Sequence, residues 1–211
     1  PVLLENHQEW SIGGAGNLAL NIQSLGTEVT LISVTGKDKE GYKLLELLQD
    51  SGVECAVGGD LETTTTKTRL VAKGGQHIVR WDREVLYTGE HSIDRLDSHI
   101  RKGDIICISD YAKGTVRRDT VANLLEKEVK ILVDPKQDAN FYYGAYLVKP
   151  NMQEYEAWFG KWDQKEALRQ MQRFNWTWLV VTDGANGMHV LNILDEYKHF
   201  SEPVKEVADV T

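Results

Sequence analysis

From about residue 104 onward, short apolar runs rich in β-branched residues alternate with stretches of helical periodicity. The strand-like runs are 104–109, 129–134, 145–149 and 176–182, and the helical stretches are 116–128, 152–159 and 164–174. Nearly continuous apolar strands separated by helices are typical of a parallel sheet covered on both faces. The sequence therefore predicts an α/β fold built on a largely parallel central sheet.

Each of these predicted strands ends in polar residues. The four strand ends are Ser109-Asp110-Tyr111, Asp134-Pro135-Lys136, Lys149-Pro150-Asn151 and Thr182-Asp183-Gly184. Parallel sheets bind their ligands at the carboxyl ends of the strands. We therefore expect a ligand site along this edge.

The stretch 61–84 has a different pattern. Two β-rich runs, 64–73 and 76–82, are joined by Gly74-Gly75, which is a signal for a two-residue hairpin turn. An antiparallel ribbon inserted into an α/β domain typically lies outside the main sheet. We expect one domain over residues 1–211, with a small β lid at 61–84.

Composition limits the possible partners and compartment. A net charge of −8 argues against nucleic-acid binding, although a local cluster of Lys and Arg can still hold a phosphate. No apolar run approaches the about 20 residues of a membrane span, and Glu5 interrupts the apolar start, so no secretory signal is expected. Cys55 and Cys107 fit no metal spacing and are typical of buried free thiols. These features predict a cytoplasmic protein.

A glycine-rich segment, Gly13-Gly14-Ala15-Gly16-Asn17, opens a helical pattern that runs to Leu25-Gly26. Small residues at a helix N-terminus let a polar ligand approach the backbone N–H groups, and the Asn17 amide can both donate to and accept from sugar hydroxyls. The same glycines are equally consistent with a plain turn before a helix. The segment matches neither a Walker loop nor a dinucleotide fingerprint.

Asn151 and Glu154 lie one helical turn apart. They can order water on a nucleotide-bound Mg²⁺, or they can simply form a capping box at the start of a helix.

The segment Thr182-Asp183-Gly184-Ala185-Asn186-Gly187 follows a predicted strand and is typical of a glycine-rich β-turn between two strands.

Basic residues of the lid allow two interpretations as well. Lys67, Arg69 and Arg80 alternate along the two β-rich runs, so some of them share a face. They form either a solvated ribbon face or a cationic clamp for a substrate phosphate.

These segments together resemble the PfkB, or ribokinase-like, family of sugar kinases. The first family signature is similar to Gly13-Gly14-x-x-Asn17, followed by Leu25-Gly26, Val34-Thr35-Gly36, Asp38 and Gly41. Further segments are similar to those of the heptose-7-phosphate kinases in this family: Thr66-Lys67-Thr68-Arg69, Ile78-Val79-Arg80-Trp81-Asp82, Ser109-Asp110-Tyr111-Ala112-Lys113-Gly114 and Asp134-Pro135-Lys136. The Ser-Asp-Tyr-Ala-Lys-Gly segment is the most specific, because ribokinases and fructokinases do not usually carry it.

The resemblance implies a ribokinase-like three-layer sandwich that transfers the γ-phosphoryl group of ATP, with Mg²⁺, to a sugar hydroxyl. The implied substrate is a heptose 7-phosphate, phosphorylated at its anomeric hydroxyl to feed ADP-heptose and lipopolysaccharide core synthesis. Implied substrate contacts are Gly13, Gly14, Asn17, Lys67, Arg69, Arg80, Asp110 and Lys113. Implied nucleotide contacts are Asp134, Lys136, Asn151, Glu154, Thr182, Gly184 and Gly187, with Asn151 and Glu154 acting on the metal through water. A homodimer formed through the lid is also expected.

The family's catalytic base is the Asp of a Gly-Ala-Gly-Asp loop, and that loop does not occur in these 211 residues. The segment 207–211 resembles the residues immediately before it, so we assign no catalytic base and expect this chain alone to be inactive. No His-x-Gly-His nucleotidyltransferase motif occurs either. Two alternatives stay open: a kinase for another sugar or sugar phosphate, and a truncated, non-catalytic fragment that binds ligand or dimerises.

Overall fold

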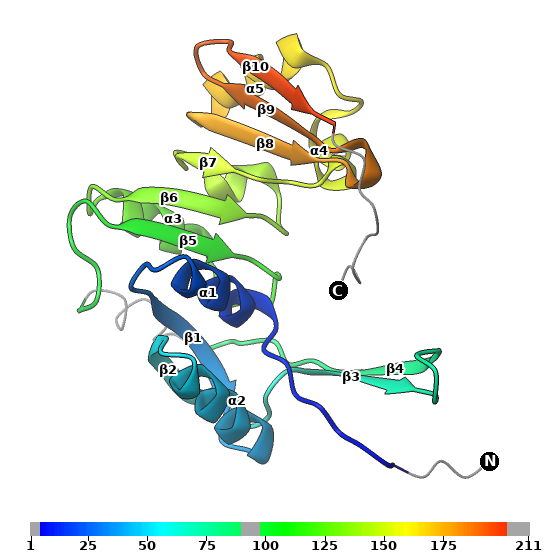
Figure 1. Cartoon of the computed structure of the whole chain (residues 1–211). Helices are drawn as coiled ribbons and strands as arrows, with labels where there is room; N and C mark the ends of the chain where they lie inside the picture. The colour runs from blue at the N-terminus through cyan, green and yellow to red at the C-terminus, as the bar shows by residue number, and fades with distance from the viewer. Residues whose placement is uncertain (1–4, 90–97, 202–211) are drawn as a thin grey trace. The chain divides into compact units, whose positions relative to one another are not determined.

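The computed structural model describes residues 5–89 and 98–201, and the chain divides into two compact units, Pro1–Ser92 and Ile93–Thr211 (Figure 1). The segments 1–4 and 207–211, on which the expectations about the chain's ends rest, lie outside the described residues. The assignment of 1–211 to a single domain stays a prediction.

The first unit begins with a helix, strand, helix and strand: α1 (Gly14–Ser24), β1 (Thr30–Gly36), α2 (Lys39–Asp50) and β2 (Glu54–Leu61). Strands β1 and β2 are parallel neighbours. Ala19, Leu31, Leu48 and Val53 form a small buried core between them and the helices. Gly16 is needed for this packing, because a Cβ there would lie 2.4 Å from Ile12 Cγ2.

Asp38, the N-cap of α2, ties this helix to the segment after β2. Its Oδ1 accepts from Gly41 N at 2.9 Å and from the Thr64 hydroxyl at 2.5 Å, while its Oδ2 accepts from Thr64 N at 2.8 Å. Thr64 Oγ1 in turn accepts from Gly36 N at 2.9 Å. Burial alone would raise the pKa of Asp38, but the hydrogen bonds from Thr64 and Gly41 hold it below its ordinary value. The Asp38 and Gly41 pattern therefore closes a turn.

The predicted hairpin is confirmed. Strands β3 (Thr66–Val71) and β4 (His77–Arg83) are antiparallel and, among the described strands, pair only with each other. The expected two-residue turn is wrong. Ala72 N donates to Gln76 O at 2.8 Å, so the connection is three residues, 73–75, and both of its glycines have positive φ.

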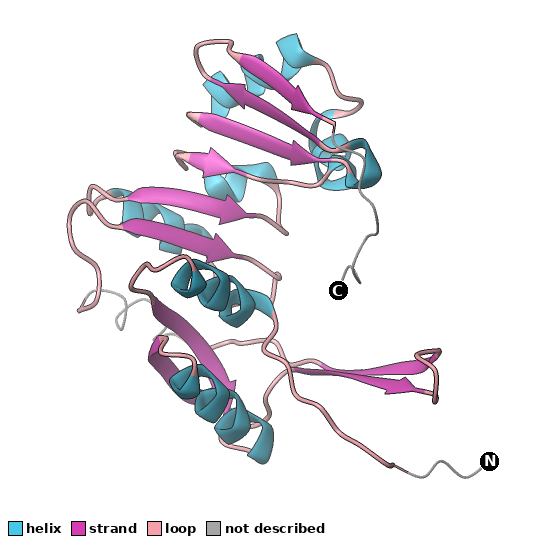
Figure 2. Ribbon diagram, viewed as in Figure 1, coloured by secondary structure: helices cyan, strands magenta, loops and turns pink. Residues whose placement is uncertain are grey.

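The second unit is built on a six-stranded sheet of order β10-β9-β8-β7-β6-β5 (Figure 2). Its strands are β5 (Ile105–Ser109), β6 (Lys130–Asp134), β7 (Leu147–Val148), β8 (Trp178–Thr182), β9 (Met188–Asn192) and β10 (Tyr197–Phe200). Strands β5 to β8 are parallel, and β9 and β10 extend the sheet antiparallel. The predicted mixed α/β fold with a mostly parallel sheet is confirmed.

The helices of this unit are α3 (Arg118–Leu125), α4 (Met152–Phe159) and α5 (Gln164–Phe174), with short 3₁₀ turns η1 (Ala139–Tyr142) and η2 (Gly184–Asn186). Helices α4 and α5 have the predicted bounds, whereas α3 is shorter than 116–128. None of the described helices has the length and apolar character that a membrane crossing requires.

Burial alternates along the strands of the second unit. Ile131 and Val133 of β6 and Leu179 and Val181 of β8 are buried in one core with residues of α3, α4 and α5. Trp176 belongs to this core, where it is stacked on Phe174 at 5.1 Å between ring centroids.

The two cysteines are free, as predicted, but the expectation that both are buried is wrong. Cys55 is half-buried and Cys107 is exposed. Cys107 alternates with the buried Ile108 on β5, an outer strand of its sheet, and therefore points away from the core.

We expect Thr64→Val to destabilise the first unit by about 1–3 kcal/mol, because the buried Gly36 N–H loses its acceptor and Asp38 loses a donor. Urea unfolding monitored by circular dichroism measures this change. Thr68→Val is the matched control, because Thr68 is exposed on β3. Equal unfolding midpoints for the two variants would show that these hydrogen bonds add no stability.

Candidate functional site

The carboxyl ends of four parallel strands lie along one edge of the second unit's sheet. Strands β5, β6, β7 and β8 are hydrogen-bonded neighbours in that order, so the residues after them follow one another along this edge. Asp110 N donates to Asp134 O at 2.9 Å, and Thr182 N donates to Pro150 O at 3.1 Å. The structure thus brings the predicted residues of all four strand ends together.

Asp110 is buried, with 6% of its surface exposed. Its Oδ1 accepts from Ala112 N at 2.7 Å, and its Oδ2 accepts from the Tyr142 hydroxyl at 2.5 Å and from Gln137 Nε2 at 2.9 Å. These hydrogen bonds satisfy both carboxylate oxygens. Asp110 therefore orders the segment that follows β5, which carries the half-buried Lys113.

Gln137 and Tyr142 are site residues that the sequence did not predict. Gln137 follows the noted Asp134-Pro135-Lys136 segment, and Tyr142 lies in the 3₁₀ turn η1. Neither belongs to a periodic pattern or a motif, so only the folded chain places them beside Asp110.

Two lysines at the strand ends, of which Lys136 was predicted to contact the nucleotide, form ion pairs with neighbouring carboxylates. Lys136 Nζ lies 3.2 Å from Glu154 Oε1, and Lys149 Nζ lies 2.9 Å from Asp134 Oδ1. Because these lysine side chains are substantially exposed, each pair contributes little stability by itself.

Asn151 and Glu154 form the capping box at the start of α4. Asn151 Oδ1 accepts from Glu154 N at 2.8 Å, and Glu154 Oε2 accepts from Asn151 N at 3.0 Å. The capping interpretation is confirmed, and both Glu154 oxygens have partners because Oε1 faces Lys136. A metal role for this pair stays a prediction.

The turn after β8 needs glycine at one position. Gly187 has a φ of +93°, and a Cβ there would lie 1.8 Å from Phe200 O, so any side chain would displace the chain. Gly184 also has positive φ, but it faces open space. Gly187 therefore has a structural reason to be glycine, whereas Gly184 leaves room beside the strand end.

The predicted glycine-rich segment opens α1 in the first unit. Gly13 is the N-cap residue and Gly14 the first helical residue, with a φ of +56°. Asn17 is exposed, and its side-chain amide has no hydrogen-bond partner among the described residues. This amide is accessible to a ligand.

Hairpin register places the three predicted cations on one face. Arg69 lies opposite Arg80, and Lys67 lies opposite Asp82, whose Oδ1 is 3.1 Å from Arg80 Nε. The other face carries Thr68, Leu70, Val79 and Trp81, of which Trp81 is 69% exposed. The hairpin therefore has one charged and one largely apolar face.

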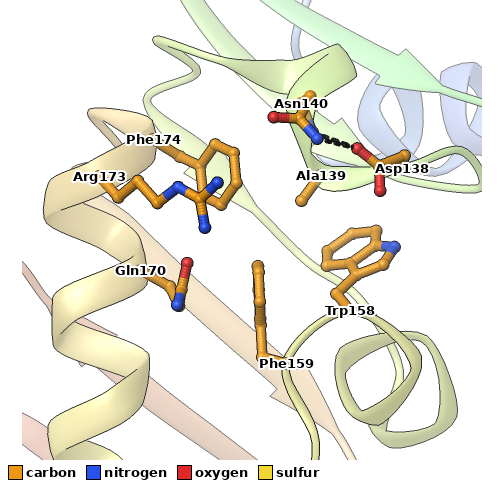
Figure 3. Close-up of a pocket in the computed structure, with 8 residues that line it drawn as sticks. All are labelled: Asp138, Ala139, Asn140, Trp158, Phe159, Gln170, Arg173 and Phe174. Atoms are coloured by element: carbon orange, nitrogen blue, oxygen red, sulfur yellow. Dashed lines mark hydrogen bonds between the residues drawn. The ribbon is translucent and has the colours of Figure 1, made fainter.

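A separate cavity of about 380 Å³ lies among η1, α4 and α5 (Figure 3). Helix α5 ends here at Phe174, just before β8 begins, so the cavity is near the amino ends of the strands. It is lined by Asp138, Ala139, Asn140, Trp158, Phe159, Gln170, Arg173 and Phe174, and none of the predicted site residues is among them.

The parts of the chain that the structure describes contain no group of three or more His, Cys, Asp or Glu side chains that could hold a metal ion.

Comparison with known proteins identifies the family. The model of the pfkB family of carbohydrate kinases matches residues 1–211. The chain belongs to the pfkB family. The bifunctional protein HldE of Pasteurella multocida is 34% identical over 100% of this chain and 47% of that protein, and HldE of Alkalilimnicola ehrlichii is 33% identical over 100% and 46%. The chain thus spans about half the length of these relatives.

Solved structures with the same fold include two sugar kinases. Phosphofructokinase-2 from Escherichia coli, in complex with fructose-6-phosphate, has a TM-score of 0.74 at 22% identity, covering 93% of this chain and 70% of that one. A double mutant of fructokinase from Vibrio cholerae, bound to fructose, ADP and potassium, has a TM-score of 0.66 at 20% identity, covering 92% and 69%. At these identities the likeness shows the ribokinase-like fold of this pfkB chain.

Proposed function

We propose that this chain forms most of a kinase that transfers the γ-phosphoryl group of ATP to the anomeric hydroxyl of a heptose 7-phosphate. In this reaction the sugar oxygen bonds to the γ-phosphorus, ADP leaves, and the hydroxyl proton passes to a base. The product would supply ADP-heptose for lipopolysaccharide core synthesis in the cytoplasm. The observation that carries the proposal is the Ser109–Gly114 segment, set at a strand end of a pfkB chain that is 34% identical to HldE.

ATP and Mg²⁺ suit the residues along the strand-end edge. Lys136 can shift from Glu154 to a nucleotide phosphate because its side chain is 56% exposed, leaving Glu154 to order metal-bound water. Asn151 caps α4 next to Glu154, and Thr182 and Gly184 offer a polar and an open position for the nucleotide. When bound, Mg²⁺ neutralises charge on the transferring phosphate.

In the second unit, Lys113 and the Asp110 turn that carries it are proposed to contact a sugar phosphate. In the first unit, considered by itself, such a contact is proposed for Gly13, Gly14, Asn17 and the charged face of the hairpin. A phosphate at the far end of the sugar suits this basic set, because each charge-assisted hydrogen bond contributes about 1.5–3 kcal/mol.

Two other functions compete with this one. A kinase for a different sugar or sugar phosphate would keep the same nucleotide residues and change the acceptor. A non-catalytic fragment that binds ligand or dimerises is favoured by a sequence fact: the Gly-Ala-Gly-Asp loop does not occur in these 211 residues.

We expect no measurable kinase turnover from the 211-residue chain alone. A general base contributes about 10²–10⁴-fold and one oxyanion-type donor about 10²–10³-fold to such a rate. A coupled ADP-release assay with ATP, Mg²⁺ and heptose 7-phosphate should compare this chain with the product of its complete gene, which we expect to be active. Robust turnover by the short chain would mean that its own residues supply the base, with Asp110 and Asp134 the first to substitute. An inactive complete product would contradict the kinase proposal.

We expect the complete gene product to prefer heptose 7-phosphate over the unphosphorylated heptose by about tenfold to a hundredfold in kcat/KM, which corresponds to one charge-assisted contact. Arg69→Ala should reduce that preference, whereas Lys73→Ala, in the connection between β3 and β4, should leave it unchanged. Steady-state kinetics on both sugars measures the ratio. Equal efficiency on the two sugars would favour the alternative acceptor.

We expect the hairpin's apolar face to form a homodimer, since an exposed apolar ribbon is otherwise a pairing hazard. Trp81→Ser should therefore lower the sedimentation coefficient of the complete product to that of a monomer. Leu194→Ser, 77% exposed in the second unit, is the control and should leave the dimer intact. A monomeric wild type at high protein concentration would refute this assembly.

A further inference from the structure

Tyr142 has a hydroxyl with no spare hydrogen-bonding capacity. It donates to Asp110 Oδ2 at 2.5 Å and accepts from Lys136 N at 3.0 Å and from Gln137 N at 2.9 Å. One donor and two acceptor positions are all that a phenol offers. The side chain is completely buried, so none of these bonds can be replaced by water.

The three hydrogen bonds of the Tyr142 hydroxyl join the segments that follow β5 and β6, which are distant from each other in the sequence. Asp110 follows β5 and begins the segment with Lys113, whereas Lys136 and Gln137 follow β6. Gln137 adds a second link, because its Nε2 donates to Asp110 Oδ2 at 2.9 Å and to Val116 O at 3.3 Å. The segment 110–116 is thus held at both ends against the chain after β6.

The link continues to the start of α4. Lys136, whose backbone N–H is held by Tyr142, pairs through its Nζ with Glu154 Oε1. Glu154 caps α4 together with Asn151. A continuous set of contacts therefore runs from the candidate sugar-phosphate segment, through Tyr142, to the candidate nucleotide residues.

Tyr142 remains a hydrogen-bond donor at physiological pH. Burial, followed by the hydrogen bond to Asp110, raises the pKa of this phenol well above its ordinary value. The proton therefore stays on the hydroxyl and points at the carboxylate.

We propose that Tyr142 is a positioning residue that holds the acceptor segment 110–116 and the nucleotide residue Lys136 in one arrangement. The inference rests on the proposed kinase function but assigns Tyr142 no contact with either substrate. Its hydroxyl sets where Lys113 and Lys136 are presented, so its loss should weaken the binding of both substrates together.

The protein contains a matched control for this claim. Tyr155 is also completely buried, but among the residues that the structure describes its hydroxyl has no hydrogen-bond partner. Tyr155→Phe removes the same atom from the same kind of surroundings without breaking a link. Differences between the two Tyr→Phe variants therefore report the hydrogen bonds of Tyr142.

Steady-state kinetics of the complete gene product tests the proposal. In Tyr142→Phe, the KM for heptose 7-phosphate and the KM for ATP should each rise about tenfold, in keeping with hydrogen bonds to a charged group. Tyr155→Phe should change neither. A merely structural role would lower the apparent kcat through loss of folded enzyme and leave both KM values unchanged. That result, or equal changes in the two variants, would overturn the inference.

Hydrogen exchange on the same proteins separates this inference from the proposed function. Backbone amides of 110–116 and 136–137 should exchange faster in Tyr142→Phe than in wild type, and at the wild-type rate in Tyr155→Phe. If the wild type phosphorylates no sugar phosphate, the kinase proposal fails, and faster exchange confined to these segments still supports the positioning role. Unchanged exchange in Tyr142→Phe would overturn that role whether or not the kinase is active.

Discussion

The parallel hydrogen-bonded ladder from β5 to β8 is the constraint on which the candidate site depends. Parallel pairing sends every carboxyl end to the same edge, so residues separated by dozens of positions in the chain become neighbours there. The buried face of this ladder, with Ile131, Val133, Leu179 and Val181, packs on the helices and holds the register. A one-residue slip would turn these side chains away from the core and would separate Asp110 from Asp134.

Several polar groups at that edge make hydrogen bonds within the chain, and these bonds hold the strand ends in place. Asp110 has its carboxylate enclosed by Tyr142, Gln137 and Ala112, and Glu154 closes a capping box. The Asp38 and Thr64 hydrogen bonds do the same in the first unit. Segments that resemble a family signature therefore include residues that shape turns, while the side chains of Asn17 in the first unit and of Lys136 in the second are exposed.

The hairpin carries its charged and its apolar side chains on opposite faces. Because successive residues of a strand point to opposite faces, the set Lys67, Arg69 and Arg80 lies on one face, and Leu70, Val79 and Trp81 lie on the other. A charged face suits an anionic substrate, and an apolar face suits a protein surface. The proposed substrate contact and the proposed dimer contact therefore use different side chains of this ribbon.

The sequence alone determined strands β5 to β8, the hairpin, helices α4 and α5 and the polar strand ends, because apolar periodicity and turn residues are local properties. It located Asp110, Lys136, Asn151 and Thr182 for the same reason, and the bounds of α4 and α5 follow from the caps at Asn151 and Asp163. Only the tertiary structure decided that Tyr142 and Gln137 hold Asp110, that Lys136 pairs with Glu154 and that Cys107 is exposed. These facts depend on which distant segments the sheet makes adjacent and on which strand lies at its outer edge, and no local pattern encodes either.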